Sequence, residues 1–192
     1  MTKIFFFDLD GTLRQTKSGK TFINEPEDQQ PIAGAEKAII YYQSKGFVCI
    51  GITNQGGVAA GHKSLESAIA EQRITLSLFP QLSEIFFCPT WGESCCQVSR
   101  DNEPLPFSAP ESGDSVISCR KPGHGMLLLA SQSFGLDDAW MTGDRPEDKQ
   151  AALTAGINFI PADVMLAKFT PGMTEIPCTH TDQNVLLKFL AL

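Results

Sequence analysis

Two aspartates stand close together directly after an apolar run near the N-terminus. Residues 3–8 read KIFFFD, and Asp8 and Asp10 lie in the text DLDGT. Two clustered carboxylates repel each other, and a divalent cation relieves that repulsion. Magnesium prefers hard oxygen ligands, and an Asp carboxylate can also act as a nucleophile toward phosphorus. The plainer interpretation of this motif alone is a polar turn after a strand.

Two further motifs carry groups that could hold a phosphate. Thr53 and Asn54 follow a second apolar run, residues 47–52, and precede two glycines, so hydroxyl, amide and backbone donors could meet phosphate oxygens there. Lys121 stands before Pro122 and could neutralise phosphate charge. A Gly-rich turn and a solvent-exposed lysine are the simpler alternatives for these two motifs.

A last motif reads GDRPED. Asp144 follows an apolar segment, and Pro146 is typical of the first turn of a helix. Asp148 would then lie near the helix start, where a negative charge is favourable. Asp148 therefore has two interpretations, a residue that stabilises the helix dipole or a residue that supports a metal.

The elements that must position these residues alternate along the chain. The pattern predicts strands at residues 3–8, 47–52, 84–88, 138–142 and 157–161, and helices at 33–44, 63–78, 123–134, 146–155 and 183–191. Such alternation predicts an α/β fold, a Rossmann-like three-layer sandwich around a mainly parallel sheet. The chemistry of such a sheet sits beyond the carboxyl ends of its strands. We expect one domain over residues 1–192, with a flap at 11–31, an irregular insert at 89–119 and no large cap domain.

Composition narrows the class of protein. The chain has 192 residues, of which 42% are hydrophobic, and its net charge is −7. This excludes general disorder and a broad basic surface for nucleic acid. With no apolar stretch of membrane-spanning length and no signal peptide, we expect a cytoplasmic protein, and we favour a monomer. Structural disulfides are then not expected among its six cysteines.

In combination, the motifs resemble the haloacid dehalogenase (HAD) superfamily of phosphotransferases. TNQGG, RKPGHGM and GDRPEDKQAA are similar to the motifs of subfamily IIIA phosphatases, and the resemblance covers roughly residues 3–162. It implies that Asp8 attacks phosphorus to form an aspartyl-phosphate, while Asp10 serves as general acid and then as general base. It also implies roles for two further groups of residues. Thr53, Asn54 and Lys121 would bind phosphate, and Mg²⁺ would be held by Asp8, the Asp10 backbone carbonyl and Asp144, with Asp148 as a further metal residue.

Two motifs point to different classes of substrate. The flap text DLDGTLRQTKSGKTF is similar to the 3′-phosphatase domain of polynucleotide kinase/phosphatases, and its cations Arg14, Lys17 and Lys20 could meet a nucleic-acid end. The text CRKPGHGM resembles histidinol-phosphate and heptose-1,7-bisphosphate phosphatases, and its Arg120 is a further residue that could bind substrate. A solvated basic loop is the simpler interpretation of the flap.

Those sugar-phosphate relatives commonly carry a zinc loop, which this chain matches only in part. Cys88 and Cys119 stand at its outer positions, but Thr90 and Ile117 stand where two other ligands are expected. Cys95 and Cys96 could substitute, since zinc accepts four thiolates, yet adjacent cysteines are poorly spaced for one ion. We therefore expect magnesium, and zinc on these four cysteines is the less favoured alternative.

These observations lead to one main expectation and two alternatives. The main expectation is a magnesium-dependent phosphomonoesterase that acts on a small phosphorylated metabolite such as a sugar phosphate. The first alternative is a polynucleotide 3′-phosphatase. The second is a phosphate-binding protein without catalysis, which would not need both Asp8 and Asp10.

Overall fold

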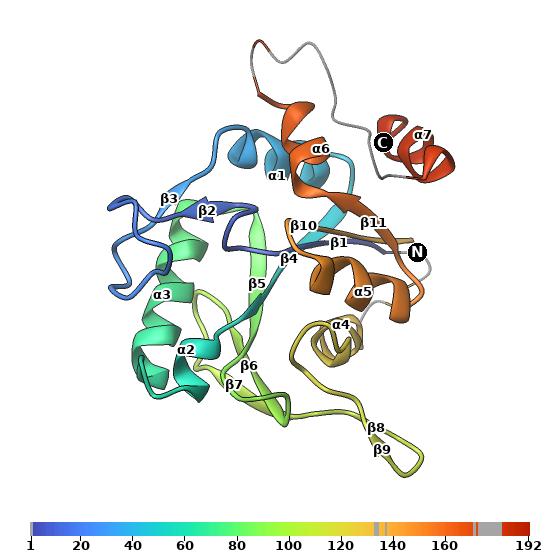
Figure 1. Ribbon diagram of the computed structural model, residues 1–192. Coiled ribbons are helices and arrows are strands. Elements are labelled where there is room, and N and C mark those ends of the chain that lie inside the picture. Colours follow the sequence, from blue (N-terminus) through green and yellow to red (C-terminus); the bar gives the residue numbers. More distant parts are fainter. Residues whose placement is uncertain (1, 133–134, 137, 171, 173–181) are drawn as a thin grey trace.

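A seven-stranded sheet forms the centre of the computed structural model, which describes all residues except 1, 133–134, 137, 171 and 173–181. The strand order is β11-β10-β1-β4-β5-β6-β7 (Figure 1). The strands are β1 (Lys3–Phe7), β4 (Phe47–Asn54), β5 (Leu82–Cys88), β6 (Ser94–Val98), β7 (Leu105–Ser108), β10 (Ala139–Gly143) and β11 (Asn158–Pro161). The first five strands in this order pair in parallel, and β6 and β7 are added antiparallel at one edge.

Helices cover both faces of the sheet, which confirms the predicted three-layer α/β architecture. The helices are α1 (Ala35–Ser44), α2 (Gly56–Ala59), α3 (Leu65–Leu78), α4 (Gly125–Ser131), α5 (Pro146–Thr154), α6 (Ala162–Ala167) and α7 (Gln183–Leu190). Helices α1, α3, α6 and α7 pack on one face, and α4 and α5 pack on the other (Figure 1). Phe5 and Phe7 point into the first layer and Ile4 and Phe6 into the second, so the apolar run of β1 is buried on both sides.

Parallel pairing brings the site residues to one edge of the sheet. In β1, Phe7 pairs with Thr142 of β10 on one side and with Gly51 of β4 on the other. The backbone N–H of Asp8 continues this ladder by donating to the Thr142 carbonyl at 2.9 Å. The polar residues that follow β1, β4 and β10 therefore emerge side by side.

Residues 89–119 are more regular than we expected. They contain β6 and β7, which extend the main sheet, and a hairpin of β8 (Glu111–Ser112) and β9 (Ser115–Val116) that projects from the body (Figure 1). Each of these strands spans five residues or fewer, so local periodicity carries little signal. β6 is held by pairing with β5, β7 by pairing with β6, and β8 and β9 pair with each other. In the flap, β2 (Arg14–Gln15) pairs with β3 (Gln30–Pro31).

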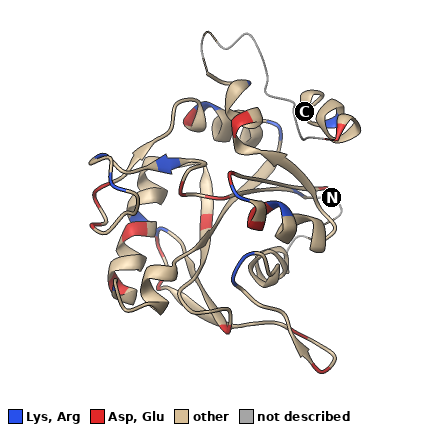
Figure 2. Cartoon of the chain, viewed as in Figure 1, with Lys and Arg blue, Asp and Glu red and all other residues tan. Residues whose placement is uncertain are grey.

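Charged residues of both signs lie on the flap and around the helices in the described part of the chain (Figure 2). None of the described helices has the length and apolar character needed to cross a membrane.

Candidate active site

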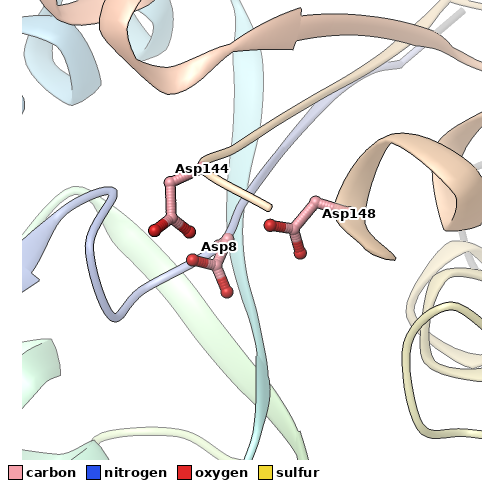
Figure 3. Close-up of side chains that lie close together, drawn as sticks. All are labelled: Asp8, Asp144 and Asp148. Atoms are coloured by element: carbon pink, nitrogen blue, oxygen red, sulfur yellow. The ribbon is translucent and has the colours of Figure 1, made fainter. Parts of the chain in front are cut away.

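Three aspartates converge at the carboxyl ends of β1 and β10. Asp8 follows β1, Asp144 follows β10 and Asp148 lies in the first turn of α5, and their carboxylates face one another (Figure 3). Their nearest ligand oxygens all lie within 4.8 Å of one another. Asp8 and Asp148 are buried, whereas Asp144 is exposed, so the cluster opens to solvent on one side.

Lys121 supplies the positive charge that this cluster needs. Its Nζ lies 2.5 Å from Asp8 Oδ1 and 2.6 Å from Asp148 Oδ1, and it donates to the Ile52 carbonyl at 3.1 Å. The lysine is only 5% exposed, and the peptide bond to Pro122 is cis. The lysine predicted from RKPGHGM thus belongs to the carboxylate cluster and is not a solvated surface residue.

Burial and neighbouring charges shift the titration of these groups. Burial raises the pKa of Asp8 to about 7, with Lys121 opposing the rise and Asp148 adding to it. Burial and Asp148 also raise the pKa of Asp144. Burial alone would lower the pKa of Lys121, but Asp8 and Asp148 outweigh it and raise that pKa above its ordinary range. Burial thus makes the ionised forms of these carboxyl groups less favourable, and a bound cation would offset that cost.

Two glycines make room for this arrangement. Gly11 has a φ of +87°, and a Cβ there would lie 2.4 Å from Asp144 Oδ2. A Cβ at Gly143 would lie 2.4 Å from three side-chain atoms of Asp148. Any other residue at either position would displace an aspartate of the cluster, so both glycines serve close approach.

The polar residues near the strand ends support the cluster in different ways. Thr12 donates to Asp8 Oδ2 at 3.1 Å, and Thr53 donates to Asp10 Oδ2 at 3.4 Å. Asn54 Nδ2 donates to the Lys121 carbonyl, and Asn54 Oδ1 accepts from the Lys121 N–H, each at 3.0 Å. Asn54, predicted to bind phosphate, thus uses both ends of its amide to hold the Lys121 backbone.

Arg14 occupies a place that the sequence did not predict. We expected it to be a flap cation available to substrate, but its side chain is fully buried and forms ion pairs with Asp10 and Glu71. Burial alone would raise the pKa of Asp10, but the Arg14 guanidinium outweighs it and holds that pKa below its usual range. The prediction of direct substrate contact by Arg14 is therefore wrong.

The other two flap cations do lie on the surface. Lys17 and Lys20 are both exposed, and Lys17 donates to the Glu27 carbonyl at 2.9 Å. Asp28 accepts from the N–H of Ser18 at 2.8 Å on the same flap. Lys17 and Lys20 can thus face solvent or a ligand, but they share the flap with acidic residues.

Sequence reasoning missed the buried partners of Arg14. Glu71 lies in α3 with an exposure of 1%, and it pairs with Lys63 as well as with Arg14. Gln55, directly after the second motif, donates to Glu71 Oε1 at 2.9 Å. The sequence does indicate that Glu71 is buried, because Glu71 and Thr75 fall on the same helix face as the core residue Ala68. Charged residues rarely occupy such a face without a partner.

Arg120, which we also expected to bind substrate, packs against the ring of Trp91. The ring of Trp91 is 60% exposed, and the Arg120 guanidinium carbon lies 5.2 Å from its centroid. A Cβ at Gly56 would lie 3.0 Å from Arg120 Nη2, so Arg120 lies over the start of α2. The Nη1 atom of Arg120 is buried and has no hydrogen-bond partner among the described residues.

The cysteines considered for zinc do not share one face of the sheet. Cys88, Cys95 and Cys119 are buried in the core beside α4, whereas Cys96 belongs to the core on the opposite face. Adjacent residues of a strand point in opposite directions, so Cys95 and Cys96 cannot serve one ion together. Within the described ranges, Asp8, Asp144 and Asp148 form the group of potential ligands close enough to share a metal.

Comparisons with known proteins assign the family. Residues 3–143 match the family model described as polynucleotide kinase 3 phosphatase. The chain belongs to this family. It is also 30% identical over 165 residues to D-glycero-beta-D-manno-heptose-1,7-bisphosphate 7-phosphatase of Haemophilus ducreyi, covering 81% of this chain and 79% of that protein. The Yersinia pestis protein of that name is 32% identical over 79% of this chain and 75% of its own length.

The predicted HAD subfamily IIIA resemblance and the phosphatase activity are thereby confirmed. The phosphatase also matches a structure described as D,D-heptose 1.7-bisphosphate phosphatase from B. bronchiseptica complexed with magnesium and phosphate. The TM-score is 0.61, the identity is 21%, and 98% of each chain is covered, which establishes a common fold. The histidine biosynthesis bifunctional protein HisB of Legionella pneumophila is 30% identical over 84% of this chain and 41% of its own length.

Proposed function

We propose that this phosphatase is a magnesium-dependent phosphomonoester hydrolase in which Asp8 forms an aspartyl-phosphate. The observation that carries the proposal is the arrangement of three facing carboxylates with one buried lysine that contacts two of them. A phosphate binder needs positive charge, and a cluster of three carboxylates is a poor choice for binding alone. A nucleophile, a metal site and a phosphate-binding cation account for all these groups together.

The residues present fit a hard divalent cation. Carboxylate oxygens of Asp8, Asp144 and Asp148 lie close together, and burial, with a smaller contribution from Asp148, raises the pKa values of Asp8 and Asp144. Magnesium takes such oxygen ligands and keeps several waters, in agreement with a cluster that opens to solvent. Asp8, Asp144 and the Asp10 backbone carbonyl would hold it, supported by Asp148. When bound, Mg²⁺ would neutralise phosphate charge and orient the phosphoryl group.

The first chemical step uses the two aspartates of the DLDGT motif. An Asp8 carboxylate oxygen attacks phosphorus and forms a new P–O bond, while the P–O bond to the leaving group breaks. Asp10 gives its proton to the leaving oxygen, so an alcohol departs. A phosphate bound beside Lys121 adds negative charge near Asp10 and raises the pKa of that carboxyl, which favours its protonated form.

The second step returns the enzyme to its starting state. Asp10, now a carboxylate, takes a proton from a water molecule whose oxygen attacks the phosphorus of the aspartyl-phosphate. The P–O bond to Asp8 breaks, inorganic phosphate forms, and Asp8 regains its carboxylate. Throughout, Lys121 offsets the charge of the phosphoryl oxygens, and Asn54 fixes the Lys121 backbone.

We assign a small phosphorylated metabolite, such as a sugar phosphate, as the substrate class. The Haemophilus ducreyi and Yersinia pestis relatives are named for a sugar bisphosphate and align over most of this chain. Arg120, with one buried nitrogen that lacks a partner among the described residues, is a suitable contact for a second anionic group of the substrate.

A polynucleotide 3′-phosphatase is the second candidate function. The family model supports it by its description, and the exposed Trp91 with Arg120 against its face offers a stacking surface for a base. Lys17 and Lys20 on the flap could then meet backbone phosphates. The burial of Arg14 removes one of the three cations that favoured this alternative.

The test is a turnover assay with p-nitrophenyl phosphate, followed by a panel of sugar phosphates, histidinol phosphate and a 3′-phosphorylated oligonucleotide. We expect activity with Mg²⁺, loss in excess chelator, and loss in the Asp8→Asn protein. The Asp114→Asn protein serves as control, because Asp114 is an exposed residue of the β8–β9 hairpin. Full activity in chelator or in Asp8→Asn would contradict the mechanism, and preferential cleavage of the oligonucleotide would favour the second candidate.

A further inference from the structure

The Arg14 side chain is the centre of a buried polar network. Its Nε donates to Asp10 Oδ1 at 2.9 Å and its Nη2 to Asp10 Oδ2 at 3.3 Å, a two-pronged contact. Nη2 also donates to Glu71 Oε1 at 2.5 Å, and Nη1 donates to Gln29 Oε1 at 3.2 Å and to Thr75 Oγ1. Every N–H group of the guanidinium therefore has an acceptor, and the side chain cannot rotate without losing several of them.

The far side of this network is anchored in helix α3 and the flap. Glu71 accepts from Lys63 and Gln55 as well as from Arg14. Gln29 donates to the Glu71 carbonyl at 3.0 Å and accepts from Thr75 at 2.7 Å. Arg14 and Lys63 both lie against the buried Glu71 carboxylate, and Arg14 also pairs with the partly exposed Asp10.

The near side of the network ends on a carboxylate that faces the site. The Asp10 side chain is 41% exposed, whereas that of Arg14 is fully buried. Asp10 Oδ2 accepts from both Arg14 and Thr53, while among the described residues Oδ1 accepts from Arg14 alone. Because each carboxylate oxygen has about two acceptor sites, Oδ1 retains one that none of the described residues occupies.

We propose that Arg14 is a positioning residue that fixes the Asp10 carboxylate so that Oδ1 can protonate the leaving oxygen, and that Glu71 holds Arg14 in place. This inference rests on the proposed function. When the P–O bond to the leaving group breaks, the proton on Oδ1 moves to the leaving oxygen and Asp10 becomes a carboxylate. The bond from Asp8 to phosphorus forms in the same step, so atoms and charge balance. Arg14 acts through Asp10 and makes no contact with substrate.

The experiment compares esters that differ in their need for a proton. We would measure kcat/KM for phenyl phosphate and 2,4-dinitrophenyl phosphate with wild type, Arg14→Met and Arg14→Lys. General-acid catalysis contributes about 10²–10⁴-fold for a poor leaving group, so we expect Arg14→Met to lose about 10–10²-fold on phenyl phosphate. We expect a loss below about threefold on 2,4-dinitrophenyl phosphate, whose phenolate leaves without protonation. Arg14→Lys, which keeps one donor to Asp10, should lie between wild type and Arg14→Met.

A double-variant comparison separates positioning from a merely structural role. If Arg14 acts through Asp10, Arg14→Met should add little to the loss already caused by Asp10→Asn. Arg100→Met is the matched control, because Arg100 donates to the Leu76 and Phe79 carbonyls at the end of α3. It should affect the two esters equally.

Two outcomes would overturn the inference, namely equal losses on both esters or additive losses in the double variant. If Arg14→Met does not fold, Arg14→Lys and Glu71→Gln decide by the same ratio of kcat/KM values. A wild-type protein without phosphatase turnover would instead refute the proposed function. An active wild type with no dependence on the leaving group in the Arg14 variants would refute only the positioning role.

Discussion

Replacing Asp8 by asparagine should change how the stability of the metal-free protein depends on pH. In wild type, burial raises the pKa of Asp8 from 3.8 to about 7. The unfolded chain releases that proton near pH 4, whereas the folded chain keeps it until about pH 7. Between these values the folded state binds more protons, so the contribution of Asp8 to stability falls as pH rises. An asparagine side chain does not titrate, so the Asp8→Asn variant should lack this loss.

The magnitude follows from the difference between the two pKa values. At about 1.4 kcal/mol per tenfold change in an equilibrium, the ionisation of Asp8 costs the folded state at most about 4 kcal/mol above pH 7. This is a large fraction of the ~5–15 kcal/mol that stabilises a typical domain. Relative to wild type, Asp8→Asn should therefore gain about 3 kcal/mol of unfolding free energy between pH 4.5 and pH 8, because about 1 kcal/mol of the total is already lost by pH 4.5.

The assay is urea unfolding in excess chelator at several pH values, with Asp114→Asn as an exposed-aspartate control that should follow wild type. Adding Mg²⁺ should reduce the difference between Asp8→Asn and wild type at pH 8, because a cation that binds the ionised cluster stabilises only the folded state. A difference that stays constant with pH, or that favours wild type increasingly as pH rises, would refute the account of Asp8 as a carboxylate whose burial raises its pKa.

Three further predictions concern the metal, the lysine and the flap. Asp144→Asn should raise the Mg²⁺ concentration for half-maximal activity by about tenfold or more, as measured by titration, since it removes an anionic ligand; an unchanged requirement would exclude it from the metal site. Lys121→Met should lower the unfolding free energy of the metal-free protein at pH 8 by about 3–5 kcal/mol in urea, because Asp8 would lose its buried counter-ion; an equally stable variant would argue against this pairing. A Lys17→Ala/Lys20→Ala variant should retain p-nitrophenyl phosphate turnover, and if the substrate is a nucleic-acid end its binding should lose about one unit of salt slope per lost contact. An unchanged slope would leave the flap without a role in nucleic-acid binding.

The sequence could predict that Asp8 and Asp144 lie close together, because the carboxyl ends of parallel strands meet at the same edge of a sheet. Asp8 and Asp144 follow two such strands, and β1 pairs directly with β10. Asp148 had two interpretations, of which the structure shows the position at the start of a helix, while the metal role stays a prediction. It accepts from the Arg145 N–H at the start of α5, and it pairs with Lys121.

The position of Arg14 was not predictable in the same way. A basic residue in a Gly- and Ser-rich segment is normally solvated, and only a carboxylate on a distant helix makes its burial favourable. That partner, Glu71, is brought close by tertiary packing and not by any local pattern. The same reason applies to the short strands β6 and β7, since β6 depends on pairing with β5 and β7 on pairing with β6.

The central place of β1 in the sheet determines when this enzyme becomes competent during its own synthesis. β1 lies between β4 and β10, and Phe7 on one of its edges pairs with Thr142. A chain that emerges N-terminus first carries β1 with that edge unpaired until β10 has left the ribosome. Because contacts of such sequence separation form slowly, Asp8 stays without Asp144 and Asp148 for most of translation. A nascent or truncated chain that lacks the β10–α5 unit thus has the proposed nucleophile Asp8 but not the assembled carboxylate cluster.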